Sequence, residues 1–216
     1  MNAYIFLNGH YHKNDSALAR KILRNNRGRR KIIAVDGGIA FLQKMNIKPD
    51  IWLSDLDSAP RIKKGFLKNV EIEIYPAEKS KTDSELALDC CLKNKIASIT
   101  IFGWYDRIYE TDHLLGNLLL AMSGKFIKSA MSIKFIDSRQ QVYALYDDTT
   151  VISGYKNWGL SIIPISSRVI LTVIGVKYGA KNKLLRLGQT MSLRNEITSN
   201  RASVSIKGKA LVIIRE

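Results

Sequence analysis

The chain of 216 residues contains few cysteines and histidines, the residues that form disulfides in small secreted domains or bind zinc. Its only cysteines, Cys90 and Cys91, are adjacent. Neighbouring cysteines do not form an ordinary structural disulfide, and two thiols are too few for a cysteine-based zinc site. The three histidines do not show a metal-ligand spacing. We therefore expect reduced, buried thiols and a cytoplasmic protein.

Long apolar segments are missing as well. The apolar start Met1–Leu7 ends at Asn8-Gly9, which makes it too short for a signal peptide. No stretch approaches the roughly 18 consecutive apolar residues of a membrane helix. A hydrophobic content of 46% and a charged content of 25% are typical of a globular chain. No membrane partner is therefore expected.

Acidic residues are scarce relative to basic ones, 19 against 34, which gives a net charge of +15. Such a charge suits a polyanionic ligand such as a nucleotide or a nucleic acid, although a generally basic proteome produces the same value. The charge therefore leaves open a non-catalytic nucleotide- or RNA-binding protein.

Up to about residue 130, short apolar runs alternate with helical patterns. The predicted strands are Ala3–Leu7, Lys31–Val35, Ile51–Leu53, Glu71–Tyr75 and Ser98–Phe102. The predicted helices begin near Asp15, Ile39, Ile62, Thr82 and Asp112, and the last of them, Asp112–Met122, is apolar almost all round and is expected to be buried. This alternation is typical of an α/β fold in which helices cover both faces of a parallel sheet. We therefore predict an α/β domain with a Rossmann-like parallel sheet over residues 1–130.

Acidic residues recur just after these strands, at Asp36, Asp55, Asp57, Asp83 and Asp112. In open parallel sheets, ligands bind beyond the carboxyl ends of the strands. Two carboxylates two residues apart after a strand end can point the same way, and Mg²⁺ prefers such oxygen ligands. Asp83 follows Thr82 in a capping-box pattern, so a helix dipole also accounts for its charge. The recurrence predicts an acidic, Mg²⁺-binding site.

From about Ser132 onward the pattern changes to short β-rich runs separated by Gly, Asn and Ser turns. No helix-length periodic segment remains in this part. Residues 131–216 are therefore expected to form an all-β, antiparallel sandwich or barrel, and we predict the sandwich.

The motifs, taken in order, resemble the thiamine pyrophosphokinase family. In the first half they are Asp36-Gly37-Gly38, Lys48-Pro49-Asp50, Asp55-Leu56-Asp57-Ser58, Tyr75–Lys79, Thr82-Asp83-x-Glu85 and Asp112-His113-x-x-x-Asn117. In the second half they are Ser161–Ile165, Gly175-Val176-Lys177-Tyr178 and Asn195-Glu196. The resemblance implies an α/β nucleotide domain joined to a thiamine-binding and dimerisation sandwich. It also implies a homodimer that binds thiamine where the subunits meet.

The resemblance further implies the reaction: the diphosphoryl group of ATP passes to the hydroxyl of thiamine, giving thiamine diphosphate and AMP. The catalytic residues it implies are Asp36, Asp55, Asp57, Asp83, Arg107 and Asp112, of which Asp55, Asp57 and Asp83 hold Mg²⁺. The nucleotide-binding residues it implies are Gly37, Gly38, Lys79, Lys81, Thr82, His113 and Asn117. For the acceptor it implies Tyr178, Arg194 and Asn195.

The chain departs from the family pattern in two functional segments. Glu110 stands where the family has an arginine, and Arg107 is expected to replace it through a longer loop between Gly103 and His113. Arg194 stands where the family has a serine, which places a cation near a cationic thiazolium. These changes leave open another heterocyclic alcohol, such as a hydroxymethylpterin, as acceptor. Nucleic acid is a less suitable partner, because carboxylates repel its phosphates.

Overall fold

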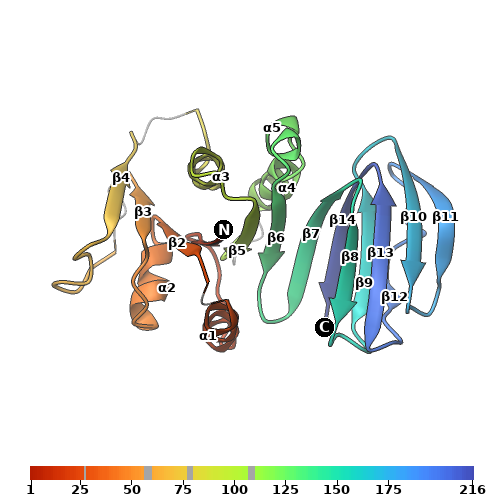
Figure 1. Cartoon of the computed structure of the whole chain (residues 1–216), viewed down its shortest axis with the longest axis horizontal. Helices are drawn as coiled ribbons and strands as arrows, with labels where there is room; N and C mark the ends of the chain where they lie inside the picture. Colours follow the sequence, from red (N-terminus) through yellow and green to blue (C-terminus); the bar gives the residue numbers. More distant parts are fainter. Residues whose placement is uncertain (27, 56–59, 77–79, 107–109) are drawn as a thin grey trace. The chain divides into compact units, whose positions relative to one another are not determined.

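The computed structural model describes residues 1–26, 28–55, 60–76, 80–106 and 110–216. Among the predicted site residues, Asp57, Lys79 and Arg107 lie outside these ranges. The chain divides into two compact units, Met1–Ser138 and Arg139–Glu216 (Figure 1). No helix within the described ranges is long and apolar enough to cross a membrane.

The first unit is built on a parallel sheet. Over the described residues its strands, in spatial order, are β6 (Ser132–Ile136), β5 (Ser98–Phe102), β1 (Asn2–Phe6), β2 (Arg30–Val35), β3 (Ile51–Ser54) and β4 (Glu71–Ile74). Phe6 at the end of β1 pairs with Ala34 of β2 on one side and Phe102 of β5 on the other. The loops that follow these strands therefore start at the same edge of the sheet.

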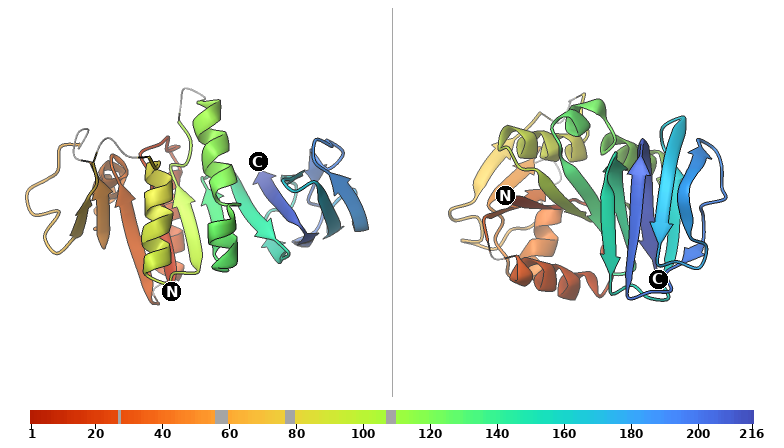
Figure 2. Two further views of the ribbon diagram at one scale, coloured as in Figure 1. Left: turned by 90° about the horizontal axis from the view of Figure 1, so that it is seen from above. Right: turned by 45° about the vertical axis from the view of Figure 1, so that its right-hand side comes forward.

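Helices cover both faces of this sheet, as Figure 1 shows and Figure 2 (left) confirms for the face under α3 and α4. They are α1 (Asp15–Asn25), α2 (Gly38–Lys44), α3 (Asp83–Lys93), α4 (Thr111–Leu120) and α5 (Gly124–Lys128). Because strand side chains alternate, Tyr4 and Phe6 join one core with Leu23 of α1 and Leu42 of α2. Two-sided burial explains why the strands read as continuous apolar runs. The predicted α/β alternation is confirmed.

Two helix predictions were wrong in part. Ile62–Leu67 does not form a helix; residues 64–69 form turns, and Gly65 and Asn69 have φ values of +77° and +67°, which a helix cannot accommodate. The predicted helix near Asp112 exists as α4, but it is not buried. Asn117 is its only buried residue, and Leu115 and Leu119 are 50% and 41% exposed.

The second unit consists of two antiparallel sheets. One has the order β12 (Asn195–Glu196), β9 (Gly159–Pro164), β14 (Lys209–Arg215), β7 (Gln140–Tyr146). The other has the order β11 (Ala180–Arg186), β10 (Arg168–Ile174), β13 (Arg201–Lys207), β8 (Thr149–Ser153). One hydrophobic cluster takes Ile162 and Val212 from the first sheet and Leu171 and Val204 from the second. The shared core is that of a sandwich.

The change of pattern lies a little further along the chain than residue 130. Strand β6 pairs with β5 in parallel, Ile99 opposite Ile133, and belongs to the first unit. The antiparallel pairing begins with β7, so the β-rich composition from Ser132 does not by itself locate the boundary.

Candidate active site

Three aspartates from separate loops meet at the carboxyl edge of the parallel sheet. Asp36 follows β2, is 6% exposed and has a φ of +43°. Its carboxylate accepts a hydrogen bond from the Asp55 backbone N–H, with 3.3 Å between nitrogen and oxygen. It also shares a side-chain hydrogen bond with Asp83 at the start of α3. The fold thus brings together Asp36, Asp55 and Asp83, although Asp36 lies 19 positions before Asp55 in the sequence and Asp83 lies 28 positions after it.

The neighbours of Asp36 make its ionisation costly. The pKa of Asp36 is raised to about 6, first by burial and then by the hydrogen bond and charge of Asp83 and the charge of Asp55. The hydrogen bond from the Asp55 backbone N–H lowers the pKa of Asp36, but by less than the other effects raise it. A cation placed among these carboxylates would relieve the repulsion.

The donor set at this cluster fits a hard cation such as Mg²⁺, because every acidic group there offers carboxylate oxygens. Within the ranges the structure describes, no group of three His, Cys, Asp or Glu side chains is already arranged as a metal site. Asp57, the other predicted ligand of the pair Asp55 and Asp57, lies outside those ranges. Mg²⁺ ligation by Asp55, Asp57 and Asp83 therefore stays a prediction.

The N-terminus of α3 carries the predicted capping box. The Thr82 hydroxyl oxygen accepts a hydrogen bond from the Glu85 backbone N–H at 3.3 Å. Asp83 and Glu85 lie in the first turn, where the helix dipole stabilises negative charge. The cap fixes where the helix begins and so fixes the position of Asp83 opposite Asp36.

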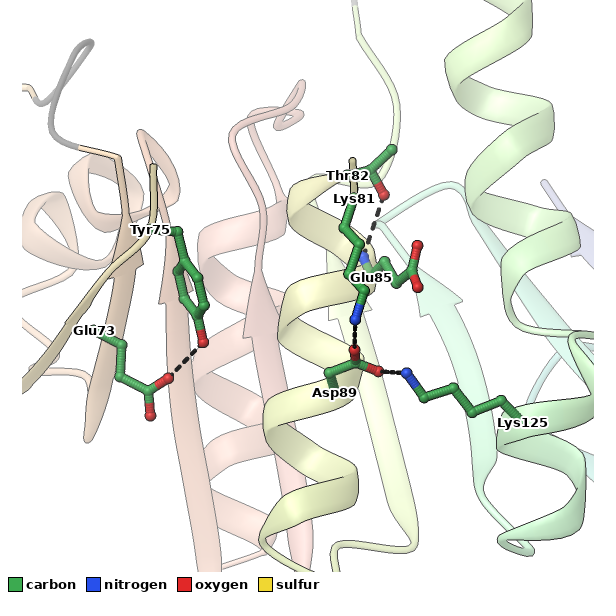
Figure 3. A network of polar contacts seen from close by, with 7 residues as sticks. All are labelled: Glu73, Tyr75, Lys81, Thr82, Glu85, Asp89 and Lys125. Carbon is green, nitrogen blue, oxygen red and sulfur yellow. Dashed lines mark hydrogen bonds and ion pairs between the residues drawn. The ribbon is translucent and has the colours of Figure 1, made fainter. Parts of the chain in front are cut away.

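Lys81, a predicted phosphate contact, is paired with a carboxylate about two turns into the helix. Its Nζ lies 2.8 Å from Asp89 Oδ2, and Lys125 of α5 binds the other oxygen of Asp89 (Figure 3). The Lys81 side chain is 42% exposed, and exposed ion pairs contribute little free energy. Lys81 can therefore exchange Asp89 for a phosphate at small cost, while Lys125 keeps Asp89 neutralised.

A pocket of about 150 Å³ opens beside the acidic cluster, between the loops after β1 and β5 and the starts of α3 and α4. Asp83, His113 and Asn117 are the predicted site residues that line it. Asp112 is exposed on the first turn of α4 and does not line it. The remaining lining residues were not predicted to belong to the site; they are Leu7, Asn8, Gly9, Ser84, Gly103, Trp104, Tyr105, Asp106 and Glu110.

Glycines let the loops around this pocket pack closely. A Cβ on Gly9 would lie 2.1 Å from the carbonyl oxygen of Gly103, so only glycine fits where these loops touch. A Cβ on Gly37 would lie 2.0 Å from Asn8 Oδ1, and one on Gly38 would lie 2.0 Å from the Phe6 carbonyl oxygen. Gly37 and Gly38, predicted to contact the nucleotide, thus also serve packing against the end of β1.

A side chain of α4 and one from the segment after β1 hold the segment after β5 in place. The Asn117 side-chain amide donates a hydrogen bond to the Trp104 carbonyl oxygen at 3.2 Å. The Tyr105 hydroxyl and His12 Nε2 are 2.6 Å apart, and the His10 backbone N–H donates to the Tyr105 carbonyl oxygen. The turn Asn8-Gly9 after the first strand was the sequence signal that could have indicated this part of the site.

A second pocket, of about 400 Å³, lies in the second unit and gathers all three predicted acceptor residues, Tyr178, Arg194 and Asn195. The Tyr178 backbone N–H donates to the Asn195 side-chain oxygen at 3.0 Å. The Asn195 side-chain amide donates to the Tyr178 carbonyl oxygen at 2.9 Å. This reciprocal pair holds Tyr178, whose ring is 68% exposed, at the mouth of the pocket.

Comparison with known proteins gives a matching family model for each of the two parts of the chain. Residues 24–135 match the family model of the thiamin pyrophosphokinase catalytic domain, and residues 149–213 match that of the thiamin pyrophosphokinase vitamin B1 binding domain. The thiamine pyrophosphokinase of Bacillus subtilis (strain 168) is 31% identical over 187 residues, which cover 85% of this chain and 86% of that protein.

Solved structures show the same likeness. The crystal structure of Bacillus subtilis thiamine pyrophosphokinase aligns with a TM-score of 0.78 at 27% identity and covers 100% of this chain and 99% of that one. The thiamin pyrophosphokinase of Candida albicans has a TM-score of 0.74 at 17% identity, covering 99% and 88%, and so shares the fold. The chain belongs to the thiamine pyrophosphokinase family.

Proposed function

We propose that this chain transfers the diphosphoryl group of ATP to the hydroxyl of thiamine, giving thiamine diphosphate and AMP. The observation that carries the proposal is that the catalytic and vitamin B1 binding family models both match, in order, over 24–135 and 149–213. The convergence of Asp36, Asp55 and Asp83 at one sheet edge supports the same chemistry. Diphosphoryl transfer depends on neutralising phosphate charge and placing the hydroxyl in line.

The acidic cluster is the proposed Mg²⁺ site, with Asp55, Asp57 and Asp83 as ligands. Mg²⁺ bound there supplies positive charge to the phosphate oxygens. Asp36, whose raised pKa reflects its crowded surroundings, holds the Asp55 backbone in place through its carboxylate. Removing the charge of Asp55 or Asp57 should therefore abolish turnover without unfolding the chain.

The 150 Å³ pocket is the proposed nucleotide site of this Rossmann-like unit. Thr82 caps α3, and the dipole at the first turn of this helix favours a ligand that carries negative charge. Lys81 can release Asp89 to contact a phosphate, and Lys79 and Arg107 are the further cations proposed there. Asn117 acts by holding the Trp104 backbone, and His113 lines the opening.

The acceptor is proposed to bind in the pocket of the second unit, against Tyr178, Arg194 and Asn195. We further infer a homodimer in which each β-unit completes the partner's active site, since closed two-fold pairs are the commonest oligomers. Exposed apolar side chains support a contact surface on both units, Leu115 and Leu119 on α4 and Tyr178 beside the pocket. The free, buried Cys90 and Cys91 fit a reducing compartment such as the cytoplasm.

The proposal is tested by the nucleotide product. Purified protein with ATP, Mg²⁺ and thiamine should release AMP, not ADP, in step with thiamine diphosphate. Asp55→Asn and Asp57→Asn should each stop this release while urea unfolding stays close to that of the wild type. AMP release at a near-normal rate from either variant would rule out the metal assignment.

The shared site is tested by complementation. Asp55→Asn chains and Tyr178→Ala chains should each be inactive or impaired, and a mixture that exchanges subunits should recover part of the activity. The recovery follows because one of the two sites in the mixed dimer carries neither substitution. A fully active monomer, or a mixture that stays inactive after exchange, would refute the shared site.

A further inference from the structure

The pocket of the second unit combines an apolar floor with a cationic rim. Its floor is formed by Ile162, Leu171, Val173 and Leu185, which belong to the core of the unit. Its charged lining residues are Lys181, Lys183 and Arg194, and none of the lining residues that the structure describes is acidic. A volume of about 400 Å³ is sufficient for a ring system. The pocket thus offers apolar contact at its base and positive charge at its mouth.

Strand geometry explains how lysines come to line this pocket. Side chains two residues apart on a strand share a face, so Lys183 lies on the same side of β11 as the buried Leu185. Lys183 pairs with Leu171 of β10, whose side chain is 3% exposed in the core. An irregularity in the pairing follows, where Asn182 has a φ of +50°. Lys181, beyond this irregularity, also lines the pocket.

A structural explanation for the lysines also exists. Strand β11 is the outermost strand of its sheet, and inward-pointing charges on such strands prevent edge-to-edge pairing between molecules. That explanation accounts for a charge on the strand. It does not account for a third cation, Arg194, which comes from a different segment and lines the same pocket. The convergence of cations from two segments points to a ligand.

We propose that this pocket selects its ligand by charge and binds the phosphate ester of a heterocyclic alcohol more tightly than the free cationic alcohol. The inference rests on the proposed function, in which the alcohol is thiamine and the ester is thiamine diphosphate. The thiazolium ring of thiamine is a cation, and each phosphate group adds up to about two negative charges at neutral pH. Phosphorylation therefore reverses the sign of the ligand's interaction with Lys181, Lys183 and Arg194.

The consequence for the reaction is retention of the product. A ligand that gains affinity when it is phosphorylated leaves the pocket slowly and competes with the next acceptor molecule. All three cations are exposed, so salt weakens their effect; the screening length falls from about 10 Å at 0.1 M to about 3 Å at 1 M ionic strength. The preference for the ester should therefore decrease as salt is added.

The experiment compares thiamine, thiamine monophosphate and thiamine diphosphate by calorimetric titration into the full chain, in EDTA and without ATP. Without a divalent cation the aspartate cluster repels phosphates, so a metal-bridged contact at that cluster cannot supply the affinity for the ester. We expect affinity to rise along the series, with the diphosphate binding at least about tenfold more tightly than thiamine at low salt. The double variant Lys181→Gln/Lys183→Gln should reduce this ratio about fivefold or more and leave thiamine binding unchanged or improved.

A matched control separates a local effect from net charge. Lys156→Gln/Lys207→Gln removes two exposed lysines of the same unit that do not line the pocket, and it should leave the ratio within about twofold of the wild type. Equal losses in the two double variants, or a wild type that binds thiamine at least as tightly as the diphosphate, would overturn the proposal. Self-association of Lys181→Gln/Lys183→Gln with an unchanged ratio would assign the lysines to edge protection alone. AMP release with thiamine tests the proposed function separately and can persist in any of these cases.

Discussion

The crowding of carboxylates around Asp36 should make the cation-free protein less stable as pH rises. The pKa of Asp36 lies at about 6, compared with an ordinary value of 3.8, because of burial, the bond to Asp83 and the charges of Asp83 and Asp55. The folded chain therefore binds this proton more tightly than the unfolded chain. Stability from this source is complete below about pH 4 and is lost as pH rises to about 6 and above. At about 1.4 kcal/mol per pH unit, the loss amounts to about 3 kcal/mol.

Asp36→Asn isolates this contribution. Asparagine keeps the side-chain oxygen that accepts the Asp55 N–H, tolerates the φ of +43° and can donate to Asp83 without ionising. Urea unfolding in EDTA, followed from pH 4 to pH 8, should show little difference between variant and wild type at the acid end. Near pH 7 the variant should be more stable by up to about 3 kcal/mol.

Asp89 provides a control of opposite sign. Burial raises its pKa, but the hydrogen bonds and charges of Lys125 and Lys81 outweigh burial, so the pKa lies below its ordinary value. Asp89→Asn should therefore cost stability at pH 7 and little at low pH. Two results would show that the carboxylates do not repel one another as described. One is a stability difference between Asp36→Asn and the wild type that does not change with pH. The other is a variant whose stability relative to the wild type is lowest near pH 7.

Three further predictions concern the surroundings of the site. Gly9→Ala should destabilise the chain by about 2 kcal/mol or more in urea unfolding, because its Cβ would lie 2.1 Å from the Gly103 carbonyl oxygen; an unchanged midpoint would contradict this contact. Thr82→Ala should cost about 1 kcal/mol through loss of the cap on α3, and Thr82→Ser should recover most of it. Arg107→Ala should lower kcat for AMP release about tenfold, whereas Glu110→Ala should have little effect; the reverse result would show that Glu110 occupies the functional position.

Local sequence patterns predicted the strands and most helices of the first unit, because the spacing of apolar and capping residues in the sequence matches the burial and the ends of these elements in the fold. Strands buried on both faces read as apolar runs, and Thr82-x-x-Glu85 predicted the start of α3 to the residue. The aspartates after β2 and β3 were predicted to meet because parallel strands end at one edge, and Asp36 and Asp55 do. The contact of Gly9 with Gly103 joins residues 94 positions apart, and no local pattern records it.

The failures have equally specific causes. Ile62–Leu67 has helical spacing, but Gly65 and Asn69 adopt positive φ, and spacing carries no information on that preference. Lys81 was predicted to contact phosphate, and this stays a prediction; its ion pair with Asp89, which also binds Lys125 of α5, was not expected from the sequence. Lys181 and Lys183 were not among the residues predicted to belong to a site. Only the burial of Leu185 on the same strand places Lys183 on the inner face.

The exposed helix α4 shows what hydrophobicity alone can and cannot predict. Its apolar composition predicted burial, yet Leu115 and Leu119 are exposed in the single chain. Apolar residues on a helix indicate that its surface is to be buried, but they do not indicate which other part of the protein or which partner buries it. The same helix starts at the proposed nucleotide pocket, which Glu110, His113 and Asn117 line. A second subunit that covered Leu115 and Leu119 would therefore hold the first turn of α4 in place, which links assembly of the proposed dimer to the geometry of its active site.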